Sequence, residues 1–213
     1  MADHDKSDTA LHVWYHVHSA LLAFIMSFSL VLNFLFIIVL KKMKSRRSNK
    51  DCASSNIEKS YTYLLFHLAF ADMLGVVLNI PFDIIRNVGI DYHTSIIGCK
   101  LLNPSQLAST TAQAGTYVAL SYHRFRAIVY PIRANLTVCK SILMICIIWI
   151  ISFCLSLPYV LVLRLNETNC TEKWPQDDLS SMIYTFSIFS VQYAAPVALM
   201  AVFYISIARA LHE

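Results

Sequence analysis

Five long apolar stretches alternate with short polar segments along the chain. They run over residues 13–40, 61–80, 101–130, 141–163 and 182–210. Each is at least as long as the roughly 20 residues that a helix needs to cross a bilayer. Segments such as LVLNFLFIIVL and ILMICIIWIISFCLSLPYVLVL are apolar on every side, which excludes a solvated helix face. The pattern predicts an all-α integral membrane bundle of five transmembrane helices, with an N-terminal segment at 1–12 and a short end at 211–213.

The third stretch differs from the other four in its composition. Its first part, LLNPSQLASTTAQAGTYVAL, consists of small and mildly polar residues on all sides. Small residues allow neighbouring helices to approach closely, and polar groups at membrane depth are tolerated where protein surrounds them. We therefore predict that this helix occupies the centre of the bundle.

Charge supports a membrane protein and gives its orientation. Of the 213 residues, 57% are hydrophobic and only 14% are charged, against about one quarter charged in an ordinary soluble domain. Twelve of the 17 lysines and arginines lie in segments 41–59 and 124–140 or at Arg209. Because basic residues are enriched on the cytoplasmic side, we expect an extracellular N-terminus, a cytosolic C-terminus and a multi-pass protein of the plasma membrane.

The cysteines and the glycosylation sequons fit this orientation. Of six cysteines, Cys99 and Cys170 fall on the outer side, and the others fall in cytosolic loops or within the fourth stretch. Only the first pair meets an oxidising compartment, so a Cys99–Cys170 disulfide is predicted. Asn166 and Asn169 begin sequons in the same outer loop and are predicted to accept glycans.

Polar residues inside a membrane are costly and mark candidate functional sites. Asp72 lies near the middle of the second stretch. It is either a cation or proton site or a carboxylate hydrogen-bonded to asparagines such as Asn33. In the third stretch, helical periodicity places Gln106, Gln113, Tyr117 and Arg124 on one polar stripe. The stripe either serves function or simply hydrogen-bonds the bundle together.

The sequence offers no sign of an enzyme or of a nucleic-acid-binding protein. It has no phosphate-cradling glycine loop and no nucleophile motif. The basic segment 41–50 is more typical of a cytosolic loop facing lipid than of a nucleic-acid patch. A transporter or channel that uses Asp72 and the polar stripe is an alternative, although no inverted repeat supports it.

Taken in order, several residues of these stretches resemble the markers of the rhodopsin-like (class A) G-protein-coupled receptors. The resemblance covers helices one to five of that seven-helix fold. Its residues are Asn33, Leu68, Ala69, Asp72, Cys99, His123-Arg124-Phe125, Trp149, Pro158, Pro196 and Tyr204.

The resemblance implies a role for each main marker. Asp72 is similar to the family's sodium-binding acid, and Arg124 to the arginine that meets the heterotrimeric G protein. Tyr204 resembles the tyrosine that holds this arginine on activation, and Pro196 the proline that distorts helix five. Gln106 stands at the ligand-facing position, where a glutamine disfavours amines and favours a peptide ligand, here a neuropeptide.

Three departures from the family pattern carry expectations of their own. His123 replaces the acid before the arginine and Phe125 the tyrosine after it, so the usual carboxylate-guanidinium restraint is absent. We expect raised basal activity or a pH-sensitive resting state. His67 also replaces the usual asparagine of the second helix.

The chain ends at Glu213, soon after the fifth stretch. The family's sixth and seventh helices have no counterpart before that residue. We expect the sequence to be a fragment of a longer receptor. The alternative is a truncated, non-signalling receptor that forms dimers with full-length receptors.

Overall fold

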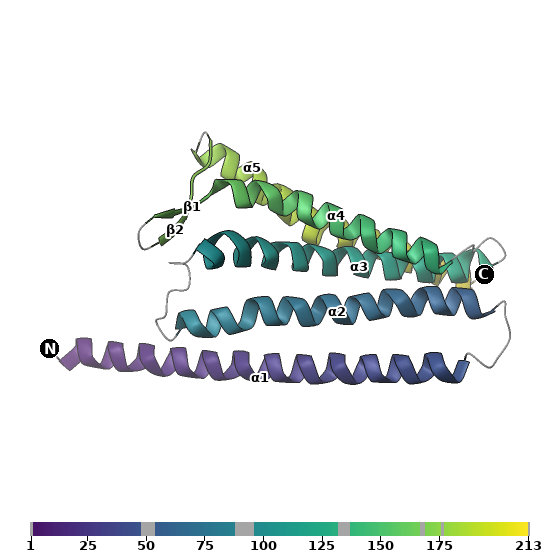
Figure 1. Ribbon diagram of the computed structural model, residues 1–213, viewed down its shortest axis with the longest axis horizontal. Coiled ribbons are helices and arrows are strands. Elements are labelled where there is room, and N and C mark those ends of the chain that lie inside the picture. Colours follow the sequence, from purple (N-terminus) through teal and green to yellow (C-terminus); the bar gives the residue numbers. More distant parts are fainter. Residues whose placement is uncertain are drawn as a thin grey trace.

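The computed structural model describes residues 2–47, 54–87, 96–131, 137–166, 169–175 and 177–212. It is a bundle of long helices with one small β-hairpin (Figure 1). The helices are α1 (Ala2–Arg47), α2 (Ser54–Asn87), α3 (Asn103–Val129), α4 (Val138–Val162), α5 (Asp177–Phe189) and α6 (Ala195–His212). Two π-helical turns, η2 (Gly98–Leu102) and η4 (Ser190–Ala194), precede α3 and α6. Strands β1 (Leu163–Asn166) and β2 (Asn169–Glu172) pair antiparallel.

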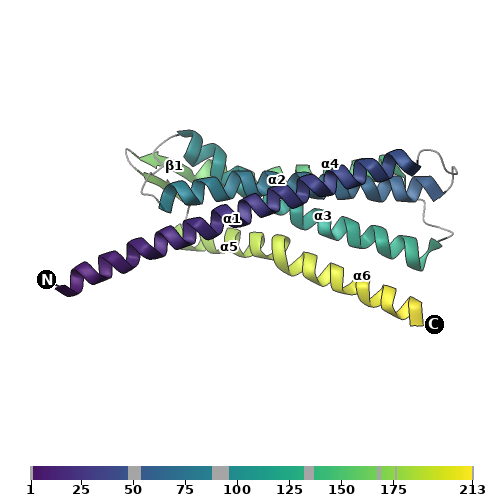
Figure 2. The same ribbon diagram turned by 90° about the horizontal axis from the view of Figure 1, so that it is seen from below.

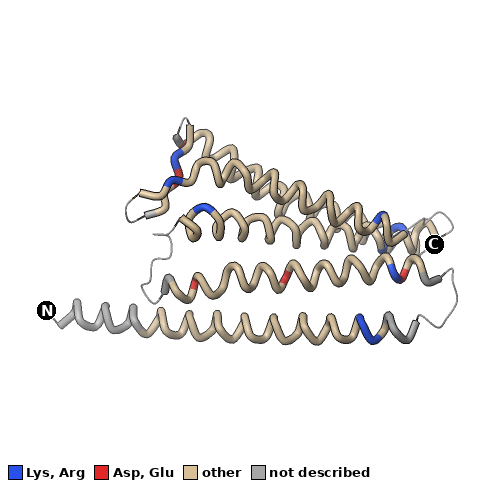
Figure 3. Tube along the Cα trace, in the orientation of Figure 1, with Lys and Arg blue, Asp and Glu red and all other residues tan. Residues whose placement is uncertain are grey.

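Four of the described helical segments are long and apolar enough to cross a membrane. They are Val13–Met43, Asn56–Ile85, Val138–Val162 and Asp178–His212. Large apolar side chains remain exposed along these helices, for example Phe24, Phe153 and Phe186. Lysine, arginine, aspartate and glutamate lie mainly toward the helix ends (Figure 3). This distribution suits a bundle that is surrounded by lipid along its length.

Helix α3 lies at the centre of the bundle. It contacts α2, α4 and α6, whereas α1 packs mainly along α2 and α6 runs obliquely to the other helices (Figure 2). The residues that α3 buries are small or polar, among them Ala108, Ser109, Ala112 and Thr116. Small side chains let three helices approach α3, which confirms its predicted central position.

Helix bounds differ from the apolar stretches in two places. Helix α1 begins at Ala2, so the backbone of residues 2–12 of the expected N-terminal segment continues the first helix. Met1, the side chains of this segment and Glu213 lie outside the described residues. The fifth stretch is divided by η4, where the backbone N–H of Ala195 donates to the carbonyl of Ser190. Pro196 has no N–H and clashes with the preceding turn, so a π-helical turn forms there. The predicted distortion at Pro196 is confirmed.

The two ends of the bundle are chemically distinct. At one end, which we call the disulfide end, Cys99 of η2 and Cys170 of β2 form a disulfide with a Cα–Cα distance of 5.5 Å. The predicted pairing is therefore confirmed. At the opposite end, which we call the arginine end, lie Arg124 of α3 and the start of α4. There the hydroxyl of Thr137 accepts from the N–H of Lys140 and caps α4.

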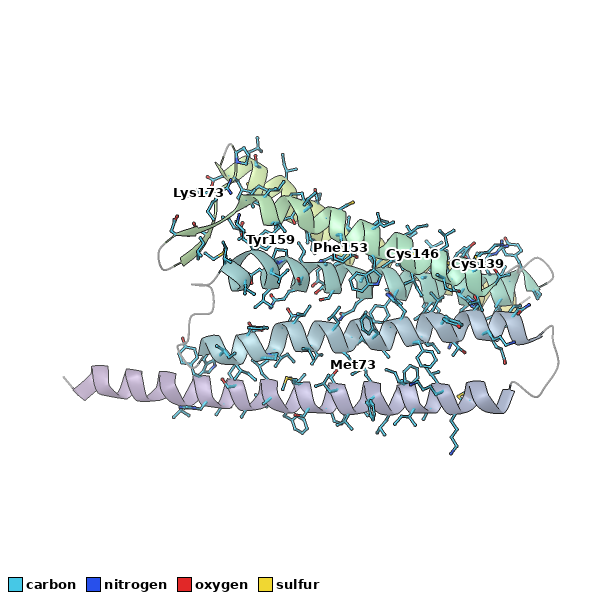
Figure 4. All side chains as sticks on the ribbon, in the orientation of Figure 1. Met73, Cys139, Cys146, Phe153, Tyr159 and Lys173 are labelled. Atoms are coloured by element: carbon cyan, nitrogen blue, oxygen red, sulfur yellow. A yellow bond between two sulfur atoms is a disulfide. The ribbon has the colours of Figure 1, made fainter. Side chains whose placement is uncertain are left out.

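Free cysteines lie on α4, away from the disulfide. Figure 4 labels Cys139 and Cys146 along this helix, with Phe153 and Tyr159 toward the disulfide end and Lys173 beside the hairpin. Cys139, Cys146 and Cys154 are all exposed. Substituting these free cysteines is a control for substituting the two cysteines of the disulfide.

Candidate functional site

A cavity of about 530 Å³ opens at the disulfide end, between α2, α3, the hairpin and α5. Gln106 lines it, as expected for a ligand-facing residue. Its amide Nε2 donates to the carbonyl of Leu78 on α2 at 2.7 Å, which fixes the side chain. The lining residues are Asp83, Asn103, Gln106, Leu107, Thr110, Tyr159, Glu172, Tyr184, Thr185, Ile188, Gln192 and Tyr193.

Both charged residues in this lining are acids. Asp83 comes from α2, and Glu172 comes from β2, two residues after the disulfide-bonded Cys170. Trp174 Nε1 donates to Glu172 Oε2 at 2.8 Å and holds that carboxylate in place. The lining thus contains two acidic residues and no basic one, which favours a cationic group in a ligand.

Tyr184 connects α5 to α4 next to the cavity. Its hydroxyl donates to the carbonyl of Leu155 at 2.8 Å, in the turn before Pro158. A proline inside a membrane helix weakens the backbone bonding of the preceding turn, and the Tyr184 hydroxyl adds a hydrogen bond from α5 to that turn. Pro158 lies within α4, as the sequence markers placed it, and the structure adds this contact from α5.

A buried histidine joins three helices at the middle of the bundle. Trp149 Nε1 on α4 donates to His67 Nε2 on α2 at 2.8 Å, and His67 Nδ1 lies 3.0 Å from Thr116 Oγ1 on α3. Since Nε2 is an acceptor here, the neutral ring carries its proton on Nδ1 and donates it to Thr116. Thr116 in turn donates to the carbonyl of Ala112 at 2.6 Å. Each polar side-chain atom of His67, Thr116 and Trp149 therefore has a hydrogen-bond partner.

Asp72 lies on α2 and is half-buried. Asn33 does not pair with it, because the Asn33 amide donates within α1, to the carbonyl of Ser29 at 3.0 Å. The alternative of an Asn33–Asp72 hydrogen bond is therefore wrong. No group of three or more His, Cys, Asp or Glu side chains that could hold a metal is found among the described residues. Among the described residues, Asp72 is the one carboxylate proposed for a cation at this depth. Sodium binding by Asp72 stays a prediction.

The polar stripe of α3 faces α2 over most of its length. Gln106 bonds Leu78, Gln113 Nε2 donates to the carbonyl of Ala71 at 2.9 Å, and Arg124 bonds Tyr61. Gly75 makes room for Gln113, since a Cβ at this glycine would lie 2.4 Å from Gln113 Nε2. Tyr117, the fourth residue of the stripe, has 43% of its surface exposed.

At the arginine end, His123 of α3 bonds Ser60 of α2, and Ser60 in turn links α2 to α4. His123 is only 2% exposed, and its Nε2 lies 3.2 Å from Ser60 Oγ. Ser60 also contacts the hydroxyl of Ser141 and the carbonyl of Thr137. A carbonyl only accepts, so the Ser60 proton goes to Thr137, and Ser60 Oγ accepts from Ser141 and from His123 Nε2–H.

Arg124 is held by an aromatic residue of α2. Its Nε donates to the hydroxyl of Tyr61 at 2.9 Å, and its guanidinium carbon lies 5.2 Å from the centre of the Tyr61 ring. The side chain is exposed at the end of the bundle. Tyr61 thus takes the place that the missing acid would have.

Phe125 and Tyr204 are the other two residues expected to act at the arginine end. Phe125 stacks on Phe203 of α6, with ring centres 5.4 Å apart, and so ties α3 to α6. Tyr204 is 52% exposed on α6, and the structure does not bring it to Arg124. Its role on activation stays a prediction, as does glycosylation. Asn166 is exposed in β1, and the side chain of Asn169 lies outside the described residues.

Sequence reasoning missed the acids of the cavity and the partners of both histidines. Asp83 lies at the end of an apolar stretch, and Glu172 lies in a loop that the sequence does not show as a hairpin. Ser60, Thr116 and Ser141 gave no signal, because serine and threonine in membrane helices are usually satisfied by their own backbone. The sequence contained one indication that these histidines have unusual partners, because His67 and His123 stand at positions where the family has other residues.

Comparison with known proteins agrees with this architecture. The model of the family described as 7 transmembrane receptor (rhodopsin family) matches residues 52–213, which is more than half of the chain. The chain therefore belongs to the rhodopsin family of seven-transmembrane receptors and is a multi-pass membrane protein.

Its similar relatives include several neuropeptide receptors. Neuropeptide FF receptor 2 of Rattus norvegicus is 28% identical over 168 residues, which cover 71% of this chain and 40% of that protein. Neuropeptide FF receptor 1 of Homo sapiens is 29% identical over 163 residues, or 69% of this chain and 38% of that one. Neuropeptide S receptor of Mus musculus is 29% identical over 148 residues, or 67% and 40%. The chain spans about two fifths of the length of these relatives.

Proposed function

We propose that this chain belongs to a receptor that binds an extracellular peptide and activates a heterotrimeric G protein. The observation that carries the proposal is the 530 Å³ cavity lined by Gln106 and two carboxylates. It has room for several side chains of a peptide and favours one that is basic. The names of the relatives, receptors for neuropeptides FF and S, support the same ligand class.

We infer the orientation from the disulfide. Because disulfides form in oxidising compartments, we propose that the disulfide end and the N-terminus face outward and that Arg124 faces the cytosol. A G protein would then meet the exposed guanidinium of Arg124, which Tyr61 holds at the end of α3. We also propose Asp72 as the site for a sodium ion, supported by its position midway along α2 and the absence of a hydrogen bond to Asn33.

The test is peptide-dependent activation of G proteins in cells that express the receptor. We expect peptides with a basic residue to activate it and their uncharged analogues to fail. Glu172→Gln should lower potency about tenfold, the effect of losing roughly 1.4 kcal/mol of charge-assisted binding. Asp178→Asn, an exposed acid of α5 that does not line the cavity, should leave potency unchanged. Equal losses in both variants, or activation by uncharged peptides alone, would contradict the proposal.

A second prediction concerns the resting state. His123 bonds Ser60 and Arg124 bonds Tyr61, so Arg124 has no carboxylate partner among the described residues. We expect His123→Asp to lower ligand-free signalling about fivefold, since a pair worth roughly 1 kcal/mol would then favour the resting state. Tyr61→Phe removes the hydroxyl that accepts from Arg124 and should raise ligand-free signalling. Equal ligand-free signalling in His123→Asp and the parent, at matched surface expression, would sink this idea.

A further inference from the structure

Gln192 of the π-helical turn η4 links the cavity at the disulfide end to α3. It lines the cavity, although only 8% of its surface is exposed. Its Nε2 donates to Thr111 Oγ1 at 2.8 Å and to the carbonyl of Leu107 at 3.3 Å. A side-chain amide nitrogen carries two N–H groups, so both N–H groups of Gln192 are committed to α3.

These two partners determine which end of the Gln192 carboxamide faces α3. The carbonyl of Leu107 can only accept, and the Thr111 hydroxyl already donates its proton to that carbonyl at 2.8 Å. The atom of Gln192 that meets them must therefore be the nitrogen. Turning the amide over would set Oε1 against two acceptors, so the oxygen stays as the free end of the side chain.

The Oε1 atom of Gln192 accepts no hydrogen bond from the described residues. Within this part of the chain, no buried side-chain nitrogen or oxygen lacks a partner. Oε1 must therefore reach open space, and the space that Gln192 lines is the cavity. A side chain that is almost fully buried thus presents one hydrogen-bond acceptor to a ligand.

This acceptor makes the cavity selective for the polarity of the ligand group that meets it. A ligand that placed a carbonyl, ether or carboxylate oxygen against Gln192 would bring two acceptors together away from water, which is unfavourable. A ligand that places an N–H there forms a hydrogen bond instead. Sites built around one hydrogen bond discriminate strongly against the analogue that lacks the matching group.

We propose that Gln192 determines ligand specificity by selecting ligands that place an uncharged N–H group against its Oε1. This inference rests on the proposed peptide-binding function and adds a second recognition element to the same cavity. Asp83 and Glu172 favour a cation, whereas Gln192 recognises a neutral amide of the ligand. Because the N–H groups of Gln192 hold α3, the side chain cannot turn to donate to a ligand acceptor.

The experiment compares two probes that differ in a single group. Para-aminomethylbenzamide carries a cation and an amide N–H, and methyl para-aminomethylbenzoate has an ester oxygen in place of that N–H. Saturation-transfer NMR titrations of the purified chain in phosphatidylcholine nanodiscs give the dissociation constant of each probe. We expect the amide to bind about fivefold more tightly than the ester, the effect of one hydrogen bond. In Gln192→Met, which keeps the length of the side chain but has no acceptor amide, the two probes should bind equally.

Two further variants separate this role from general packing and from the cation site. Ser190→Ala removes a hydroxyl of the same π-helical turn that donates to the carbonyl of Phe186 and does not line the cavity, so the fivefold ratio should remain. Glu172→Gln should weaken both probes alike and also keep the ratio. If Glu172→Gln leaves both affinities unchanged, the proposed cation site is wrong, and the ratio still tests Gln192.

Two results would overturn the role of Gln192. One is equal affinity of the amide and the ester for the parent, and the other is an unchanged fivefold ratio in Gln192→Met. The ratio in the parent needs no variant and decides the question if Gln192→Met fails to fold.

Discussion

Replacing His67 with leucine should destabilise the bundle by about 2 kcal/mol, the cost of leaving a buried donor unpaired. Leucine nearly matches histidine in volume, so little cavity forms, but the indole N–H of Trp149 loses its acceptor. In lipid no water replaces that acceptor. Thr116 keeps its bond to the carbonyl of Ala112 and contributes little to the loss. The measurement is the thermal unfolding midpoint of the purified chain in detergent.

A double-mutant cycle separates this contact from general packing. His67→Leu and Trp149→Phe each break the same hydrogen bond, so the double variant should be less destabilised than the sum of the two. His67→Asn retains an acceptor for Trp149 and a donor for Thr116 and should recover part of the loss. Additive effects of the two single variants would show that the 2.8 Å contact contributes nothing of its own.

Hydropathy predicted the helices well, because lipid imposes a simple rule on them. A segment that crosses a bilayer must satisfy its backbone internally and be apolar outside, and four of the five predicted stretches meet both conditions. Helix α3 was recognisable for the opposite reason, since only a helix shielded by its neighbours can carry so many small polar residues. The Cys99–Cys170 pair followed from topology, because the predicted orientation left only these two cysteines in an oxidising compartment.

Side-chain partners were less predictable, because they depend on how helices rotate against one another. Helical periodicity placed Tyr117 and Arg124 on the same stripe as Gln106 and Gln113, but it could not show that the first two are exposed and the two glutamines half-buried. The same periodicity could not show that His123 turns toward Ser60 and leaves Arg124 to Tyr61. Asn33 failed as a partner of Asp72 for a local reason, since Ser29 lies one turn away on its own helix.

The hairpin and the π-helical turns were also beyond the sequence reasoning. Strands β1 and β2 have four residues each, too few for periodicity to reveal. Both π-helical turns end two residues before a proline, η2 before Pro104 and η4 before Pro196. Prolines predict a local distortion, but its form depends on how the neighbouring helices pack.

Removing the Cys99–Cys170 disulfide should lower both the stability of the bundle and its affinity for a peptide. The bond closes a loop of 71 residues, for which chain entropy alone gives about 4 kcal/mol. The helices stay in the bilayer when they separate, which already limits their freedom, so we expect Cys99→Ala/Cys170→Ala to lose about 2 kcal/mol. The hairpin would also lose its attachment to η2, and Glu172, two residues after Cys170, would leave the cavity wall. Thermal unfolding and peptide affinity measure the two effects.

The free cysteines of α4 provide the control for this experiment. Cys146→Ala/Cys154→Ala removes two exposed thiols without touching the disulfide and should unfold at the temperature of the parent. Reducing agent should lower the unfolding temperature of the parent and of this control but leave Cys99→Ala/Cys170→Ala unchanged, because that variant has no disulfide to reduce. If the two double variants unfold at the same temperature, the disulfide does not stabilise the bundle. If peptide affinity survives in Cys99→Ala/Cys170→Ala, the hairpin does not need its covalent tie to hold Glu172 in the cavity.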